Sequence, residues 1–240
     1  NGRDKYTKVD KLTSVVASRS DLIEDYSHIR SLGEALSGSK VHTYGLANCK
    51  FNPVSLATFV ESVCWETGAI AHLALGSNPI GDEAMIPLLD TLKDIPLISF
   101  DISKTNCGVS TASKLAELLT DETKFKGAVT SVNCLNNPLG EGLHIIIKVF
   151  EETPRLRTLC GFEEGVEQID WSKSQKGPVE VALLAADLKA GRAIAAINSI
   201  ALDECLITGT TFGAGYGEHQ GGDYEKIEKL DADLSGFNSL

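Results

Sequence analysis

One arrangement of apolar positions recurs along the chain at intervals of about thirty residues. Written LxxLxLxxNxL, it places apolar residues at its first, fourth, sixth and last positions and Asn, Cys or a small polar residue at the ninth. Good copies begin at Val41, Ile70, Leu97, Val129 and Ile197, and weaker copies begin at Val166 and Ile227. Successive copies start 29, 27, 32, 37, 31 and 30 residues apart. Such regular spacing predicts a stack of similar units that share one continuous core.

Each copy predicts a short strand that ends in a sharp bend. The first three apolar positions lie on the strand and point into the core. The ninth position falls where the chain turns out of the strand. An Asn side chain there can form hydrogen bonds with backbone groups that the bend leaves unpaired. Asn78 and Asn137 hold this position in two of the copies.

Six cysteines accompany the repeat, and four of them fall at its core positions. Cys49 and Cys205 replace the Asn, where a thiol is small enough to be buried. Cys107 holds a last apolar position, and Cys134 holds a strand position. We therefore favour buried thiols, with three disulfides as the alternative. The absence of CxxC spacing disfavours a zinc site.

Apolar residues with helical spacing fill the stretches between the predicted strands. They are found in Val54–Trp65, Ile80–Leu92, Leu139–Phe150 and Val179–Leu188. Gly81 and Gly140 directly follow the last apolar repeat position, where glycine permits a tight exit turn. Acidic residues come next, as suits the N-terminus of a helix. The predicted unit is therefore a strand, a turn, a helix and a return loop.

Two of these strand exits have closely similar sequences, NPIGDEAM from Asn78 and NPLGEGLH from Asn137. They resemble the ribonuclease-inhibitor-like class of leucine-rich-repeat proteins, over about residues 41–207 and more loosely to residue 237. The resemblance implies a curved α/β solenoid of about six to seven repeats, with parallel strands on the concave face and helices on the convex face. The class includes inhibitors, GTPase activators, immune receptors and cytoskeletal caps, so it implies a fold and no single function.

We expect three parts along the chain: residues 1–40 as an N-terminal arm and capping helix, residues 41–207 as leucine-rich repeats, and residues 208–240 as a Gly-rich loop and a C-terminal capping repeat. The capping helix is predicted over Ser18–Leu36, with Leu22, Tyr26, Ile29 and Leu32 on one apolar face. Six glycines lie between Gly209 and Gly222. We favour a return loop there over a phosphate-cradling loop, because no Walker lysine follows.

The longest interval between copies contains the sequence LRTLCGFEEG, residues 156–165. Leu156 and Leu159 have the spacing of a strand that is started and then abandoned. This stretch predicts an insertion or a degenerate repeat, and with it a bulge on one edge of the array.

Charge narrows the classes of partner. The 240 residues carry a formal net charge of −11, and residues 121–240 account for −8 of it. This balance disfavours nucleic acid and favours a basic protein partner. No apolar run reaches the length of a transmembrane helix. We expect an intracellular protein, in the cytoplasm or an organelle matrix. The first residue is Asn, so we also expect a processed or truncated chain whose targeting peptide could have been removed.

Strand positions that face away from the predicted core form the candidate binding surface. We select His42, His72, Asp101, Asn133, Asp170, Asp203, Glu204 and Asp231. His42 and His72 are expected to be neighbours, with Ser99 and Asp101 nearby, so a metal site is an alternative there. We favour two polar residues on a solvated face. We likewise favour an acidic docking surface for Lys and Arg over a cation site.

The register assembles no Ser-His-Asp, Cys-His or paired-carboxylate constellation. We therefore predict a non-enzymatic protein-binding scaffold without a cofactor, as an accessory or interaction subunit of a larger assembly. One alternative is a regulator of a small GTPase, which the resemblance class includes. Another is a metal- or ligand-binding enzyme that uses the Gly-rich loop and His219.

Overall fold

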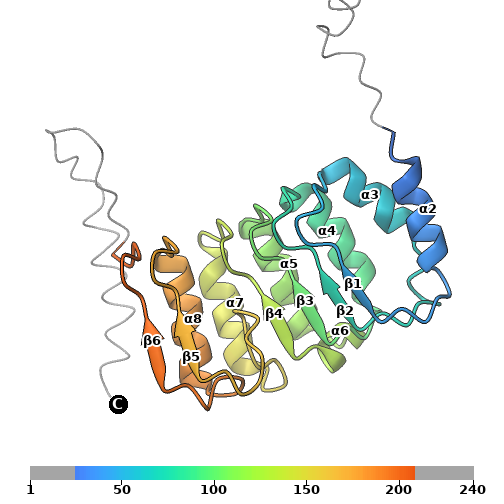
Figure 1. Ribbon diagram of the computed structural model, residues 1–240. Coiled ribbons are helices and arrows are strands. Elements are labelled where there is room, and N and C mark those ends of the chain that lie inside the picture. Colours follow the sequence, from blue (N-terminus) through green and yellow to red (C-terminus); the bar gives the residue numbers. More distant parts are fainter. Residues whose placement is uncertain (1–24, 209–240) are drawn as a thin grey trace, which may run out of the picture.

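The computed structural model describes residues 25–208, which form an α/β structure with parallel strands on one side and helices on the other (Figure 1). Seven helices and six strands lie within these residues. They are α2 Ser27–Leu36, β1 Thr43–Gly45, α3 Pro53–Ser62, β2 His72–Ala74, α4 Gly81–Leu92, β3 Ser99–Asp101, α5 Val109–Thr120, α6 Lys124–Ala128, β4 Ser131–Asn133, α7 Gly142–Glu152, β5 Gln168–Asp170, α8 Pro178–Ala190 and β6 Ser199–Ala201. Within this part of the chain, no helix is long and apolar enough to cross a lipid bilayer.

The strands pair in chain order. β1, β2, β3 and β4 form one parallel sheet, and β5 and β6 form a second parallel pair. In the first sheet Thr43 lies opposite His72, His72 opposite Ser99, and Ser99 opposite Ser131. Each of these residues is the third position of its copy of the sequence repeat. The register of the sheet is therefore the register of the repeat.

Burial of the repeat positions confirms the predicted pattern through the middle of the chain. In the copies that begin at Ile70, Leu97 and Val129, all five marked positions are buried. The middle residue of each strand from β1 to β5 points inward. The flanking residues face solvent to differing degrees, so a three-residue strand is enough to separate a core face from an open face.

The two Asn residues in the strand bends do what the sequence predicts. The Asn137 Oδ1 atom accepts hydrogen bonds from the backbone N–H groups of Thr105 and Cys107, at 3.1 and 3.0 Å. Its Nδ2 atom donates to the carbonyl oxygens of Ile102 and Cys134, at 2.7 and 3.2 Å. One buried side chain thus satisfies the bend of its own unit and that of the unit before it. Asn78 has the same role in the preceding unit: it accepts from the Phe51 N–H and donates to the carbonyls of Leu46 and Leu75.

The predicted exit glycines are also confirmed, since Gly81 and Gly140 have φ angles of 69° and 51°. The acidic residue after Gly81 has a further role. The residue before α5 is Gly108, which has no side chain to cap the helix. Asp82, at the start of α4, accepts a hydrogen bond from the Gly108 N–H at 2.7 Å and another from the Thr111 hydroxyl. Neighbouring units are therefore joined on the helix side as well.

Several sequence predictions are wrong at the two ends of the described chain. Cys49 is exposed, because no earlier strand bend lies beside it to need a buried partner. Cys205 is half-buried, Ile200 is 39% exposed and Ile207 is 44% exposed, although the repeat assigns all three to the core. Cys107 and Cys134 are buried as predicted, and all six thiols are free, so the three-disulfide alternative does not hold.

The N-terminal helix packs on a face that overlaps only partly with the predicted one. Leu32 is 44% exposed, whereas Ile29 and Leu36 pack against the core. Between them Gly33 meets α3 so closely that a Cβ atom there would lie 1.9 Å from the Ser62 hydroxyl oxygen. The close contact at this glycine turns the helix so that Leu32 faces solvent. Residues 18–24 of the predicted helix, and the copy that begins at Ile227, lie outside the described residues.

Candidate binding site

We call the side of the strands that the helices leave open the sheet face. Its two rows of outward side chains are small or polar. The first row is Thr43, His72, Ser99, Ser131, Gln168 and Ser199, and the second is Gly45, Ala74, Asp101, Asn133, Asp170 and Ala201. Short side chains of this kind let another chain approach the strands closely.

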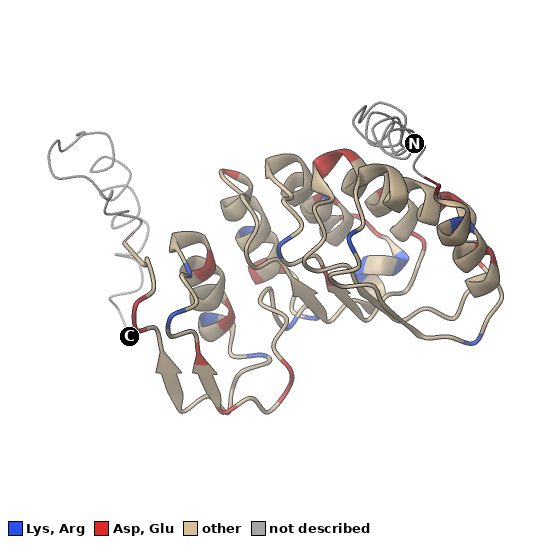
Figure 2. Ribbon diagram, turned by 45° about the horizontal axis from the view of Figure 1, so that its top comes forward, with Lys and Arg blue, Asp and Glu red and all other residues tan. Residues whose placement is uncertain are grey.

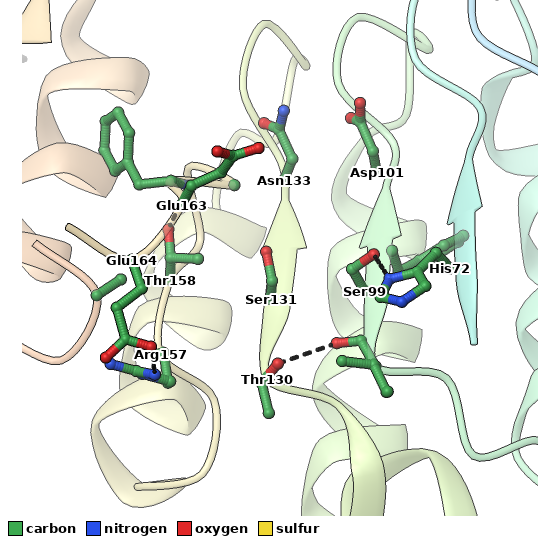
Figure 3. A pocket seen from close by; sticks show the side chains of 15 residues that line it. His72, Ser99, Asp101, Thr130, Ser131, Asn133, Arg157, Thr158, Glu163 and Glu164 are labelled. Atoms are coloured by element: carbon green, nitrogen blue, oxygen red, sulfur yellow. Dashed lines mark hydrogen bonds and ion pairs between the residues drawn. The ribbon is translucent and has the colours of Figure 1, made fainter. Parts of the chain in front are cut away.

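A hollow of about 440 Å³ lies on the sheet face over β3 and β4. Its floor includes His72, Ser99, Asp101, Ser131 and Asn133 (Figure 3). Its wall is the segment from Arg157 to Glu164. We call this segment the wall segment, and we call the cavity the sheet-face hollow.

The wall segment is part of the irregular stretch, residues 156–165, that lies in the longest interval between copies of the repeat. The backbone N–H of Arg157 donates to the Thr130 carbonyl at 2.7 Å. The N–H groups of Val132 and Cys134 in turn donate to the carbonyls of Thr158 and Leu159, at 3.1 and 2.9 Å. The stretch therefore takes a strand-like place beside β4, which favours a degenerate repeat over an insertion. The bulge rises over the sheet face instead of leaving the array at its edge.

The side chain of Asp187, which lies on α8, holds this segment in place through hydrogen bonds. Its side chain is fully buried and accepts hydrogen bonds from the backbone N–H groups of Leu159 and Cys160, at 2.8 and 3.2 Å. It also accepts from the Thr158 hydroxyl. Burial raises the pKa of the Asp187 carboxyl, and the hydrogen bonds only partly offset this rise. Asp187 thus satisfies the bend as Asn78 and Asn137 do elsewhere, but it reaches the bend from a helix.

Two arginines hold the ends of the segment. Arg192 donates from one nitrogen to the carbonyls of Phe150, Thr153 and Leu156, and so covers the C-terminus of α7. Arg157 donates to the Arg192 carbonyl and forms an ion pair with Glu164 at 2.7 Å. The hydrogen bond and charge of Arg157 lower the pKa of the Glu164 carboxyl. These contacts hold the wall against α7 and against the chain after α8.

Gly161 brings the wall and the floor together. Its φ angle is 71°, and a Cβ atom there would lie 2.7 Å from the Cβ of Asn133. Glycine is therefore required for two reasons: a left-handed backbone and a close approach. One residue later, Phe162 stacks on Trp171, with ring centroids 6.3 Å apart. The wall is thus packed between the units of β4 and β5.

The polar groups of the hollow are partly committed to one another. The His72 ring nitrogen Nδ1 lies 2.8 Å from the Ser99 hydroxyl oxygen. One oxygen of Asp101 accepts from the Ser103 N–H at 2.8 Å, and the Asn133 side-chain oxygen accepts from the Leu135 N–H at 3.2 Å. Glu163 is exposed and points toward Asn133 (Figure 3). Because Arg157 is paired with Glu164, Asp101 and Glu163 give the hollow an acidic character.

The structure brings together three of the predicted site residues: His72, Asp101 and Asn133 line the same hollow. Asp170 lies on the same face at β5, where its carboxylate accepts from the Ser172 N–H, and hydrogen bonding to Ser172 lowers its pKa. His42 is exposed and is not opposite His72, because the register pairs His72 with Thr43. The two histidines are nevertheless neighbours through the backbone, because the His72 N–H donates to the His42 carbonyl at 2.9 Å.

Two further predicted residues lie off the strands. Asp203 and Glu204 occupy the turn after β6, where Glu204 has a φ angle of 62°. A turn interrupts the alternation of inward and outward side chains, so their assignment to strand positions is wrong. Asp203 instead lies beside the preceding turn and accepts from the Ser172 hydroxyl at 3.3 Å. Asp231 and His219 lie outside the described residues.

Sequence reasoning missed Arg157, Glu163, Glu164 and Asp187. The one usable signal in the sequence was the 37-residue interval between two copies of the repeat. It marked residues 156–165 as irregular but did not show on which side of the sheet they lie. Among residues 25–208, no three His, Cys, Asp or Glu side chains come close enough together to share a metal ion. Comparison with models of known protein families and with curated proteins finds no match to this chain.

Proposed function

We propose that the chain is a leucine-rich-repeat solenoid of the ribonuclease-inhibitor-like class and that its sheet face binds a segment of a partner protein. The observation that carries the proposal is the hollow with its wall already fastened by Asp187, Arg192 and Arg157. A site that is ordered before binding loses less conformational entropy when the partner arrives. The parallel strands in chain order and the Asn side chains in the bends support the solenoid.

The proposed partner segment is basic. Acidic and basic residues are both distributed over the described part of the chain (Figure 2). In the full sequence, acidic residues exceed basic ones by 33 to 22. Within the hollow, Asp101 and Glu163 remain after Arg157 and Glu164 neutralise each other. A Lys or Arg side chain of the partner would gain charge-assisted hydrogen bonds from them. Asp170 extends the acidic character along the sheet face.

We further propose a non-catalytic role, as an accessory or interaction subunit of a larger assembly. The Asp101 and Asn133 side chains accept hydrogen bonds from the turns that follow their own strands, and they form part of the floor of an extended surface. The compartment we propose is intracellular, the cytoplasm or an organelle matrix, because exposed free thiols such as Cys49 and Cys64 suit a reducing environment.

The test is affinity capture of the tagged protein at low and moderate salt, with two charge-matched variants beside the wild type. The sheet-face variant combines Asp101→Lys with Glu163→Lys. The control combines Glu34→Lys with Glu152→Lys, both of which are exposed and lie on helices. We expect a partner that the sheet-face variant loses, that the control retains, and that dissociates as salt rises. A partner that the sheet-face variant retains at wild-type yield would refute the proposed site.

A further inference from the structure

A second hollow, of about 300 Å³, lies on the helix side between α3 and α4. Val54 and Ala57 of α3 and Pro87 of α4 contribute exposed apolar surface to it. Glu61 and Glu83 also line it, and its lining includes no Lys or Arg. We call it the helix groove. It is separate from the sheet-face hollow and shares no residue with it.

Two features of the helix groove favour its being covered by another segment of protein. Val54 is 58% exposed, more than any other large exposed apolar residue in the described part of the chain. Pro87 lies inside α4 and has no backbone N–H. The Glu83 carbonyl therefore lacks the hydrogen bond that a helix normally supplies from four residues later. An exposed apolar surface and a gap in the regular hydrogen-bond pattern of α4 thus lie beside each other.

We propose that the N-terminal segment of the same chain, residues 1–19, occupies the helix groove. The described structure begins near one end of it. The Tyr26 hydroxyl accepts a hydrogen bond from Asn52 at 2.8 Å, and Asn52 is the residue directly before α3. Residues 20–24 can span up to about 17 Å, and the ten residues of α3 are about 15 Å long. The segment can therefore reach the whole groove.

The composition of residues 1–19 complements the groove. They contain five basic and two acidic residues, a net charge of +3 in a chain whose total is −11. The lining of the groove contributes only negative charge, from Glu61 and Glu83. Val9, Leu12 and Val16 have the spacing of one apolar face of a helix. An apolar stripe with flanking lysines matches an apolar groove with flanking glutamates.

Photo-crosslinking in the full chain tests this proposal. A benzophenone amino acid is placed at Leu12, and the crosslinked peptides are identified by mass spectrometry. We expect crosslinks to residues 53–61 or 83–88 of the same chain, with a yield that does not depend on protein concentration. Crosslinks that fall only elsewhere, that join only separate chains, or that do not form would overturn the proposal.

Matched variants sharpen the test. Val54→Glu should abolish the crosslink, whereas Ile145→Glu, at an exposed apolar position on α7, should leave it unchanged. Reversal of Glu61 and Glu83 to Lys should lower the yield about two- to fivefold for each charge, and added reversal of Lys8 and Lys11 to Glu should restore it. A yield that neither Val54→Glu nor the charge reversal changes would overturn the proposal.

Discussion

Replacement of Asp187 by Ala should loosen the wall of the sheet-face hollow. The substitution removes the acceptor for the Leu159 N–H and for the Thr158 hydroxyl. It also removes one of the two acceptors of the Cys160 N–H, which keeps the Thr158 hydroxyl oxygen at 3.1 Å. All three donor residues are buried, so water cannot replace the carboxylate without opening the structure. A buried donor without a partner costs about 1–3 kcal/mol. Relief of the buried charge offsets part of this loss, which leaves an expected destabilisation of about 3 kcal/mol.

The assay is urea unfolding followed by circular dichroism, with Asp187→Asn as the conservative comparison. Asn keeps one acceptor oxygen and should cost about half as much as Ala. The pKa of Asp187 is raised, so its contribution is fully present below the unfolded pKa and declines as pH rises through the folded pKa. The advantage of Asp over Asn should therefore be smaller at neutral pH than in acid. A loss below about 1 kcal/mol for Asp187→Ala would show that these donors are not sealed from water.

Three further substitutions report on the same structure by urea or thermal unfolding. Gly161→Ala should cost about 1–2 kcal/mol, because its Cβ would press on Asn133 in a left-handed backbone, and Gly165→Ala, which meets no neighbour, should cost less; equal costs would contradict the close approach. Asn137→Ala should cost about 2–4 kcal/mol through two unsatisfied bends, and a near-neutral result would refute its bridging role. Burial raises the pKa of Asp82, but its hydrogen bonds to α5 outweigh burial and lower the pKa from 3.8. Its contribution to stability is therefore present above that value and lost as pH falls. Asp82→Asn should be less stable than wild type at neutral pH, and the difference should shrink as the pH falls below 3.8.

Sequence reasoning succeeded where one physical requirement recurs in every unit. The strand centres Leu73, Phe100 and Val132 are buried because each unit must supply an apolar side chain to the same continuous core. Asn78 and Asn137 could be assigned from type and position alone, because each bend leaves the same backbone groups unpaired. Gly81 and Gly140 are local requirements of the backbone and need no knowledge of tertiary structure.

The remaining features depend on contacts that no repeat encodes. Asp187 is one acidic residue in a helical pattern, and only the folded chain shows that it meets residues 158–160. The wall segment was recognised as an irregular stretch, but its sequence does not show which side of the sheet it covers. Gly33 explains the exposure of Leu32 only once α3 is known to lie against it. α5 and α6 were not singled out from the sequence, although α5 buries six residues.

We propose above that the sheet-face hollow binds a segment of a partner protein. Hydrogen–deuterium exchange of the chain, alone and with its captured partner, would locate the contact surface. We expect slower exchange in the complex for residues 157–164 and for β2 to β4, with little change in α3, α4 and α5. Slower exchange confined to those helices, with residues 157–164 unchanged, would contradict it.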